Sequence, residues 1–253
     1  MDTVLEVRNV KKSFRTKTSV VQAVDGMSFV LKKGEILGIV GESGCGKSTL
    51  AKIITRLIDC DEGEILLHSQ NITALKGRRL MDVYKHMQMV FQTSTESFNP
   101  RKTLGSSIME SMLNSGLKRK DAWARGETLL ELCGLHPAYM KRYPHQVSGG
   151  ECQRAAIARA IAINPSVLIF DEATSALDVT VQGQIMELLK KLREEFDMSY
   201  LFICHDLALV QQFCDYVIVM HNGKIVEQGT PDEVIKNPQT AYTKLLVDSV
   251  FSL

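Results

Sequence analysis

The stretch that decides the fold of this chain runs from Glu35-Ile-Leu-Gly-Ile-Val40 into Gly41-Glu-Ser-Gly-Cys-Gly-Lys-Ser48. The first six residues are too apolar for a half-exposed strand and predict a strand buried on both faces, as in a parallel sheet. Residues 48–57 then show the apolar spacing of a helix. The three parts together predict a strand, a glycine-rich loop and a helix in direct succession.

The loop has the pattern Gly-x4-Gly-Lys-Ser, which is that of a phosphate-binding P-loop. Its glycines let backbone N–H groups turn inward around phosphate oxygens, and the following helix adds the positive end of its dipole. Lys47 is expected to reach the β- and γ-phosphates, and the Ser48 hydroxyl to bind Mg²⁺. A plain glycine-rich turn is the alternative, which the strand before and the helix after disfavour. The residues predicted to contact nucleotide phosphates are Gly41, Ser43, Gly44, Cys45, Gly46, Lys47, Ser48 and Thr49.

Further apolar segments with strand character recur on both sides of this loop. From about residue 95 to 160 the pattern is instead mostly helical, with an amphipathic stretch at 127–133 that Gly134 ends. Strands that alternate with helices predict a parallel sheet covered on both faces, and the helical middle section is then an insert. The predicted strands are 4–10 and 20–30, which form a small sheet, and 64–68, 87–91, 167–170, 200–204 and 216–220.

Composition excludes several broad classes of protein. The chain has 253 residues, of which 45% are apolar, and this suits one large domain with a sizeable core. A net charge of +1 gives no reason to expect nucleic acid as a partner. No apolar run approaches the roughly 20 residues that span a bilayer, and the N-terminus lacks the pattern of a signal peptide. Six scattered cysteines predict free thiols in a reducing cytosol.

Two adjacent carboxylates, Asp171 and Glu172, follow the apolar run 167–170. In open α/β sheets ligands bind at the carboxyl ends of the strands. Asp171 is therefore placed to hold Mg²⁺, directly or through water, and Glu172 to orient or deprotonate an attacking water. Taken alone, two acids at a strand end are more often a solvated turn, but a P-loop in the same chain reverses that preference.

The segment Val147-Ser148-Gly149-Gly150-Glu151 narrows the class, because it resembles the signature motif of ABC-transporter ATPases, usually Leu-Ser-Gly-Gly-Gln. It opens an Ala/Arg-rich helical stretch, so Ser148 is expected at the helix N-cap. A serine hydroxyl, glycine amides and a helix dipole make a second phosphate site. In that family two subunits pair head to tail, and each ATP lies between one P-loop and the other subunit's signature. The resemblance therefore implies ATP and Mg²⁺ as cofactors.

Other residues fit the resemblance in order and spacing from about residue 4 to 240. Gln92 matches the Q-loop, which implies contact with Mg²⁺ and the γ-phosphate. Ser175-Ala-Leu-Asp178 matches the D-loop at the subunit interface, and His205 matches the switch histidine on the γ-phosphate. A lone histidine after a strand is more often structural; its place in this series reverses that. Phe14 stands where the family has an aromatic residue that stacks on adenine, although an aromatic near a strand end is often part of the core.

The sequence departs from the family pattern at two positions of the signature. Val147 replaces leucine, which we expect to matter little. Glu151 replaces glutamine and is expected to put a carboxylate near the phosphates of the opposite site. Some ABC ATPases carry glutamate here, so we expect a competent catalytic half rather than an inactive one.

A narrower resemblance links the chain to importers of peptides and nickel. It is based on Ser97-Phe-Asn-Pro-Arg101 after the Q-loop, Tyr143-Pro-His-Gln146 before the signature, and Asn237-Pro-Gln-Thr-Ala-Tyr-Thr-Lys-Leu-Leu246 near the end. Many peptide-type members have a C-terminal cysteine cluster, which this sequence lacks. It therefore looks more like the short, nickel-type members.

The resemblance implies an α/β P-loop NTPase (RecA-like) core with a small N-terminal antiparallel β subdomain and an α-helical insert. The expected ABC ATPase domain is 4–250, with 1–92 and 160–253 as the core and 93–159 as the helical subdomain that carries the signature.

The resemblance also implies partners and a location. We expect a second, homologous ATPase subunit, two integral-membrane permeases and an extracellular or periplasmic substrate-binding protein, with the chain at the cytoplasmic face of the cell membrane. An importer of another substrate stays open, as does a non-transport ABC ATPase, although such proteins usually have two ATPase halves or a long coiled-coil insert. A P-loop kinase or GTPase would not need the signature, D-loop and switch histidine together, and Glu172 argues against a binding module without catalysis.

Overall fold

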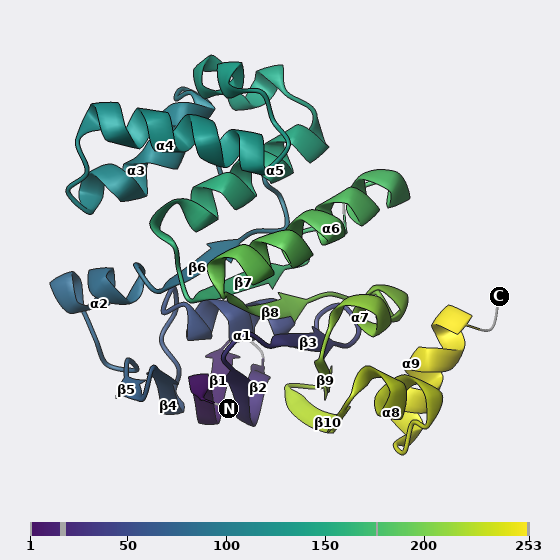
Figure 1. Ribbon diagram of the computed structural model, residues 1–253. Coiled ribbons are helices and arrows are strands. Elements are labelled where there is room, and N and C mark those ends of the chain that lie inside the picture. Colours follow the sequence, from purple (N-terminus) through teal and green to yellow (C-terminus); the bar gives the residue numbers. More distant parts are fainter. Residues whose placement is uncertain (1, 16–18, 176, 252–253) are drawn as a thin grey trace.

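The structure, a computed structural model, describes residues 2–15, 19–175 and 177–251, and within these ranges its main sheet has six strands (Figure 1). The strands are β3 (Ile36–Val40), β6 (Met87–Val90), β7 (Val167–Asp171), β8 (Ser199–Ile203), β9 (Tyr216–His221) and β10 (Lys224–Gly229). Their order is β10-β9-β3-β8-β7-β6, and all neighbours are parallel except β10 and β9. The predicted parallel sheet is therefore confirmed, with β3 at its centre.

Both faces of the parallel strands are buried, which explains their continuous apolar character. In β8, Tyr200 and Phe202 pack on one side of the sheet, and Leu201 and Ile203 pack on the other. Helices α5, α6 and α7 cover the first side, and α1 and a second sheet cover the other. The bounds of these helices are α1 (Lys47–Ile54), α5 (Gly149–Ala160), α6 (Val179–Phe196) and α7 (Leu207–Phe213).

The second sheet is small and antiparallel, as expected for the N-terminal part of the chain. Its strands are β1 (Thr3–Arg15), β2 (Val20–Lys32), β4 (Glu62–Leu67) and β5 (Gln70–Asn71), in the order β2-β1-β4-β5. The predicted strands 4–10 and 20–30 are confirmed and extend further at their ends. The pattern at 64–68 indicated a strand but not its partner, and β4 pairs with β1 rather than with the parallel sheet.

A group of helices lies between β6 and β7 in the chain and stands above the sheet in Figure 1. The helices are α3 (Leu104–Asn114), α4 (Arg119–Leu132) and α5, with two 3₁₀ helices, η1 (Pro137–Lys141) and η2 (Pro144–Gln146). The predicted helical insert is confirmed. The stretch 127–133 is the second half of α4, which ends just before Gly134, a residue with φ of +73° that suits glycine.

The remaining helices are short and flank the core. They are α2 (Gly77–Val83), η3 (Ile161–Ile163), α8 (Pro231–Lys236) and α9 (Ala241–Phe251). Figure 1 shows α8 and α9 side by side at one edge of the molecule, next to β10 and α7. In the described ranges no helix is both long and apolar enough to cross a membrane. The six cysteines, all described, are free thiols, as predicted.

Candidate nucleotide site

The loop between β3 and α1 surrounds a buried ammonium group. Lys47 is 3% exposed, and its Nζ donates to the carbonyl oxygens of Gly41 at 2.7 Å and Glu42 at 2.9 Å. Helix α1 begins at Lys47, so its first free N–H groups open into the same loop. The predicted strand, loop and helix are confirmed, and they concentrate a positive charge and bare N–H groups at the carboxyl end of β3.

Two of the loop glycines are required by close contacts. Gly41 has φ of +153°, and a Cβ there would lie 2.1 Å from the carbonyl oxygen of Met220. Gly46 has φ of +108°, and a Cβ there would lie 2.0 Å from the carbonyl oxygen of Ala23. Both contacts are with backbone, which cannot move aside easily, so any side chain would change the shape of the loop.

The end of β7 brings a carboxylate against the start of α1. Ser48 donates its hydroxyl to Oδ1 of Asp171 at 2.8 Å. Burial raises the pKa of Asp171, the nearby Glu172 charge adds to this, and the Ser48 hydrogen bond opposes it. Hydroxyl and carboxylate oxygens are the ligands that Mg²⁺ prefers. The pair predicted to hold the metal therefore lies together and has suitable chemistry.

Glu172 is the centre of a cluster of polar side chains that come from four different segments. Its Oε2 accepts a hydrogen bond from Nε2 of Gln92 at 3.0 Å and lies 3.8 Å from Nδ1 of His205. Its Oε1 lies 3.9 Å from Nζ of Lys47. Gln92, Glu172 and His205 are the residues that the sequence singled out for catalysis, and the structure brings them together beside Lys47, which was predicted to contact phosphate. His205 is the outermost member, with 56% of its side chain exposed.

The backbone of Glu172 is in an unusual conformation. Its φ is +49°, in the left-handed region that residues with a side chain seldom adopt. The conformation is held by Glu172 N–H, which donates to the carbonyl of Ile203 at 2.9 Å, and by its own carbonyl, which accepts from the hydroxyl and the N–H of Ser175. Such strain is common at functional sites, where it aims a side chain that the strand alone would not place.

One cavity of about 520 Å³ joins the loop to this cluster. Phe14, 42% exposed, lies on its wall, and its contact with a base stays a prediction. The lining residues are Phe14, Val21, Gln22, Ala23, Ser43, Gly44, Cys45, Gly46, Lys47, Ser48, Thr49, Gln92, Glu172, Asn222 and Gly223.

Five lining residues were missed from the sequence. Asn222 and Gly223 form the turn between β9 and β10, and Asn-Gly is a strong hairpin signal, although it carries no sign of a ligand. Residues 21–23 are part of the edge strand β2. The sequence predicted a strand there and gave no sign of contact with a ligand.

The signature residues do not line this cavity. Ser148 is the N-cap of α5, as predicted, and both Ser148 and Gly149 are exposed to solvent. Asp178 is likewise an N-cap, of α6, where its Oδ1 accepts from the N–H of Val181 at 2.9 Å. Ala176, in the predicted D-loop, lies outside the described residues. The signature residues and the P-loop cavity are therefore separate within the chain.

Glu151 has a local role that the sequence did not indicate. Its Oε2 accepts from the N–H of Ser148 at 2.8 Å, while Ser148 Oγ accepts from the N–H of Glu151 at 3.3 Å, which completes a capping box. The Tyr139 hydroxyl donates to Oε1, and this bond, with that from Ser148, holds the pKa of Glu151 below its usual value. The carboxylate expected near the opposite phosphates is therefore bound at the cap.

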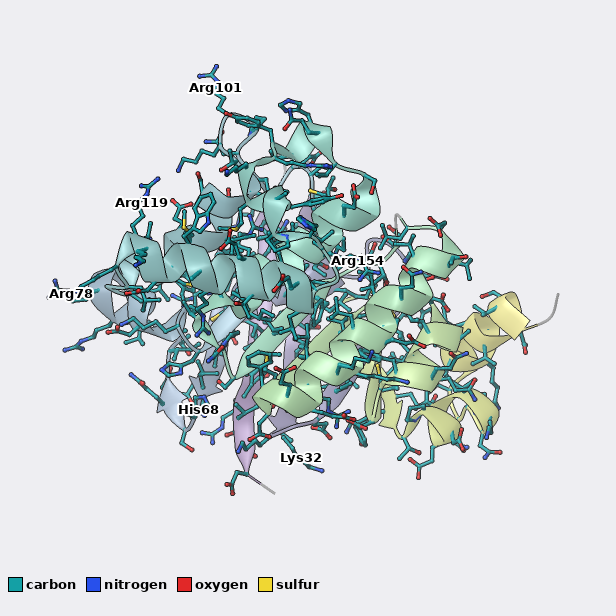
Figure 2. All side chains as sticks on the ribbon, turned by 45° about the horizontal axis from the view of Figure 1, so that its top comes forward. Lys32, His68, Arg78, Arg101, Arg119 and Arg154 are labelled. Atoms are coloured by element: carbon teal, nitrogen blue, oxygen red, sulfur yellow. The ribbon has the colours of Figure 1, made fainter. Side chains whose placement is uncertain are left out.

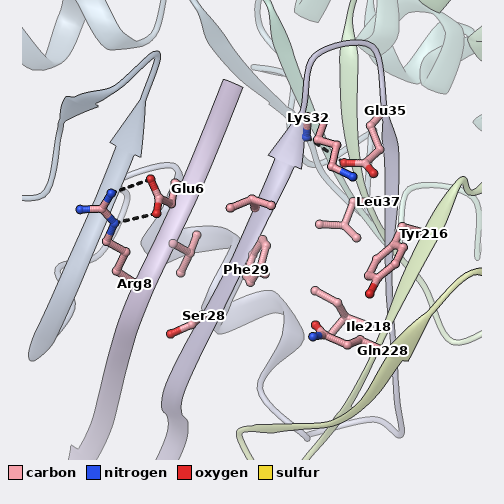
Figure 3. Close-up of a pocket in the computed structure, with 12 residues that line it drawn as sticks. Glu6, Arg8, Ser28, Phe29, Lys32, Glu35, Leu37, Tyr216, Ile218 and Gln228 are labelled. Carbon is pink, nitrogen blue, oxygen red and sulfur yellow. Dashed lines mark hydrogen bonds and ion pairs between the residues drawn. The ribbon is translucent and has the colours of Figure 1, made fainter. Parts of the chain in front are cut away.

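A second cavity, of about 420 Å³, lies between the two sheets (Figure 3). Three of its charged side chains have hydrogen-bond partners, since Arg8 donates two hydrogen bonds to Glu6 and the Glu35 carboxylate accepts from the backbone N–H of Lys32. Its floor is apolar, with Phe29 and other core side chains. The P-loop residues line the first cavity and not this one, and we place the candidate site at the first.

Comparison with known proteins decides the family. The sequence model of the family described as "ABC transporter" matches residues 24–175. The oligopeptide transport ATP-binding protein AppF of Bacillus subtilis is 47% identical over 98% of this chain and 78% of its own length. The chain belongs to the ABC transporter family.

Other relatives agree with this ABC assignment. OppF of Bacillus subtilis, an oligopeptide transport ATP-binding protein, is 43% identical over 97% of this chain and 82% of its own length. The glutathione import ATP-binding protein GsiA of Salmonella typhimurium is 47% identical over 94% of this chain, which spans 38% of GsiA.

The solved structure of the ATP-binding cassette MJ0796, a dimer bound to ADP and Pi after hydrolysis, is similar, with a TM-score of 0.83 at 28% identity. The similarity covers 90% of this chain and 98% of that one. The ABC chain described here therefore has the ABC ATPase fold and is an ATPase, which binds ATP with Mg²⁺ as its usual metal.

Replacing Asp171 by asparagine should stabilise the chain in the absence of nucleotide. Because burial raises the pKa of Asp171, the stability that this group contributes is full below its unfolded-state pKa and is lost as pH rises through its folded-state pKa. At neutral pH the wild-type chain holds a desolvated charge that asparagine lacks. We expect Asp171→Asn to raise the free energy of unfolding by about 0.5–2 kcal/mol at pH 7.5.

Urea unfolding between pH 5 and 8 measures the difference. The gain should shrink as pH falls toward the raised folded-state pKa of Asp171, because the wild-type carboxyl takes up its proton there. Asp248→Asn, at an exposed position in α9, is the matched control and should change stability little at any pH. Equal stability of the Asp171→Asn and wild-type chains across the range would contradict the prediction.

Proposed function

We propose that the chain is the ATP-hydrolysing subunit of an importer for peptides. The observation that supports hydrolysis most directly is the cluster around Glu172, where an amide, an imidazole and the P-loop ammonium all lie within 4 Å of one carboxylate. A protein that only bound nucleotide would not need a carboxylate at the strained position beside the phosphate loop.

The site residues predicted from the sequence then have separate roles in the reaction. The loop N–H groups and Lys47 bind the β- and γ-phosphates, and Phe14 packs against the base. Ser48 and Asp171 would hold Mg²⁺, with Gln92 as a further candidate ligand, and the metal would neutralise negative charge on the phosphates. Glu172 accepts a proton from the attacking water or orients it, and His205 donates a hydrogen bond to the γ-phosphate side.

A second ATPase subunit completes the site in this proposal. Ser148, Gly149 and Gly150 lie at the N-terminus of α5, outside the cavity of their own chain, where N–H groups and the helix dipole favour an anion. A head-to-tail pair places this surface over the partner's P-loop, and Glu151 supports it through the cap. Asp178, at the start of α6, would also lie at the interface between the two subunits.

The helix that carries the signature is bonded directly to the segment that follows Gln92. Arg159 of α5 donates from Nη1 to the carbonyl oxygen of Ser97 at 2.7 Å and from Nη2 to its hydroxyl at 2.9 Å. Its guanidinium lies 4.3 Å from the ring centre of Phe98. In this proposal, movement of Gln92 at the γ-phosphate reaches α5 through the half-buried side chain of Arg159.

We propose that two permease subunits dock on the surface near Gln92 to Arg101. Arg101 extends outward at the edge of the helical layer in Figure 2 and is exposed. An extracellular or periplasmic binding protein would deliver the cargo, and the chain would act at the cytoplasmic face of the membrane. No nucleic acid is expected as a partner.

Peptides are the cargo that the relatives favour, since AppF and OppF are named for oligopeptides and GsiA for glutathione. The expectation of a nickel-type member was based on the missing cysteine cluster, and these relatives do not test it, so nickel stays the second candidate. A homologous partner subunit, as opposed to a second copy, also stays a prediction.

Glu172→Gln should retain ATP binding and lose turnover. The amide preserves the size and the hydrogen bond with Gln92 but cannot accept a proton from water, and general-base catalysis contributes about 10²–10⁴-fold. Binding of MgATP by calorimetry and steady-state phosphate release measure the two properties. Glu194→Gln, at an exposed position of α6, is the matched control and should leave both unchanged. Normal turnover of Glu172→Gln would refute its assigned role.

Ser148→Arg should separate the two halves of the site. The bulky cation blocks the surface that faces the partner's ATP but lies outside the cavity of its own chain, so ATP binding by the isolated chain should stay within about two-fold of wild type. Turnover of the assembled complex should be lost. Ser148→Asn, which keeps a good N-cap, separates loss of the cap from loss of the paired site. A sharp fall in ATP binding by the isolated Ser148→Arg chain would exclude the head-to-tail assignment.

Purification from membranes tests the cargo and the partners together. We expect two permeases and a second ATPase subunit to accompany the chain, and we expect the ATPase rate of the reconstituted complex to rise when its binding protein is loaded with short peptides. An ATPase rate that rises with Ni²⁺ and not with peptides would instead support the hypothesis of a nickel importer. Isolation of the chain with ribosomes or DNA, and without permeases, would refute transport.

A further inference from the structure

The last described helix, α9, reaches back to the phosphate loop. The hydroxyl oxygen of Tyr242 accepts a hydrogen bond from the backbone N–H of Glu42 at 3.1 Å, although the two residues are 200 positions apart in the chain. Tyr242 is not one of the residues that line the nucleotide cavity. It contacts the loop from outside the site.

The bonded N–H belongs to a peptide group that is held on both sides. The carbonyl of that group, from Gly41, accepts from Nζ of Lys47 at 2.7 Å, while its N–H, from Glu42, donates to Tyr242. In a trans peptide the carbonyl and the N–H point in opposite directions across a rigid plane. The two bonds together fix the orientation of this plane, and with it the position of the Lys47 ammonium.

The ring of Tyr242 makes a second connection to the site. It packs on the imidazole of His221, with ring centres 3.9 Å apart and planes at 33°. His221 is hydrogen-bonded to the neighbouring Asn222 at 3.0 Å, and Asn222 lines the cavity. The next residue, Gly223, donates its N–H to the carbonyl of Cys45 in the P-loop at 3.0 Å. Tyr242 thus supports two walls of the cavity.

The start of α9 is itself fixed, so Tyr242 is a rigid support. The Glu227 carboxylate accepts from the N–H of Gln239 at 2.8 Å and from the N–H and the hydroxyl of Thr240, both at 3.0 Å. Thr243, next to Tyr242, is fully buried and bonded to Thr240 at 2.8 Å. A side chain held in this way limits the freedom of the loop that it contacts.

We propose that Tyr242 is a positioning residue for nucleotide binding, which acts by fixing the peptide group between Gly41 and Glu42 and the turn at Asn222. The proposal rests on the assignment of the P-loop as the ATP site. A loop already in its binding conformation loses less freedom when the nucleotide binds, so the residue raises affinity without contact with the ligand.

The test compares Tyr242→Phe, which removes only the hydroxyl, with the wild-type full chain. We expect KM and the dissociation constant for MgATP to rise about two- to ten-fold, as for the loss of one hydrogen bond, and kcat to stay within about two-fold. The melting temperature without nucleotide should fall by no more than about 2–4 °C, as for the loss of one hydrogen bond. Tyr242→Ala, which also removes the packing on His221, should raise KM further.

Tyr216→Phe is the matched control, because it removes the hydroxyl of another half-buried tyrosine, at the opposite end of β9 from the site. Unchanged KM in Tyr242→Phe, or an equal change in Tyr216→Phe, would overturn the proposal, and so would a fall in kcat at constant KM. Failure of the wild-type chain to bind MgATP would refute the ATP-site assignment itself, and the two failures are therefore distinguishable.

Discussion

The architecture depends on the need to hold one ammonium group, that of Lys47, inside the protein before any phosphate arrives. A buried charge is costly unless it is paired or hydrogen-bonded. Here two carbonyl oxygens of the loop accept from it, and a carboxylate of Glu172 lies 3.9 Å away. The carbonyls face inward only because the glycines allow the loop its shape. The Glu172 carboxylate lies near Lys47 only because β7 is beside β8 in the same parallel sheet as β3.

The parallel sheet and the P-loop could be predicted because their signals are local. A buried strand, a glycine loop and a helix N-terminus are consecutive in the chain, and the acidic pair follows an equally apolar strand. The N-cap at Ser148 was likewise predictable from the serine and the helical stretch after it. In each of these features the interacting residues are neighbours in sequence or belong to the ordered motifs of ABC ATPases.

Contacts between distant segments were not predictable in the same way. No local pattern shows that β4 pairs with β1, that the turn at Asn222 closes the cavity, or that Glu151 is bonded to Tyr139. From the sequence, Glu151 was expected to direct a charge at the opposite phosphates. Its bond with Tyr139 could not be foreseen, because Tyr139 lies in a separate 3₁₀ helix. Long-range pairing depends on the whole packing of the chain, and single residues give little sign of it.

The position of β3 has a consequence for how the chain folds. Its two neighbours in the sheet, β8 and β9, begin about 160 and about 180 residues later, so the strand that precedes the P-loop has no sheet partner until the chain has been made past Ser199. Such non-local parallel pairing is slow, because the loop-closure entropy is lost before the contacts form. The antiparallel sheet can form early from β1 and β2, whereas an incomplete chain leaves both edges of the apolar strand β3 open to aggregation. We therefore expect nucleotide binding to need a chain that includes β8 and β9, even where the P-loop itself is intact.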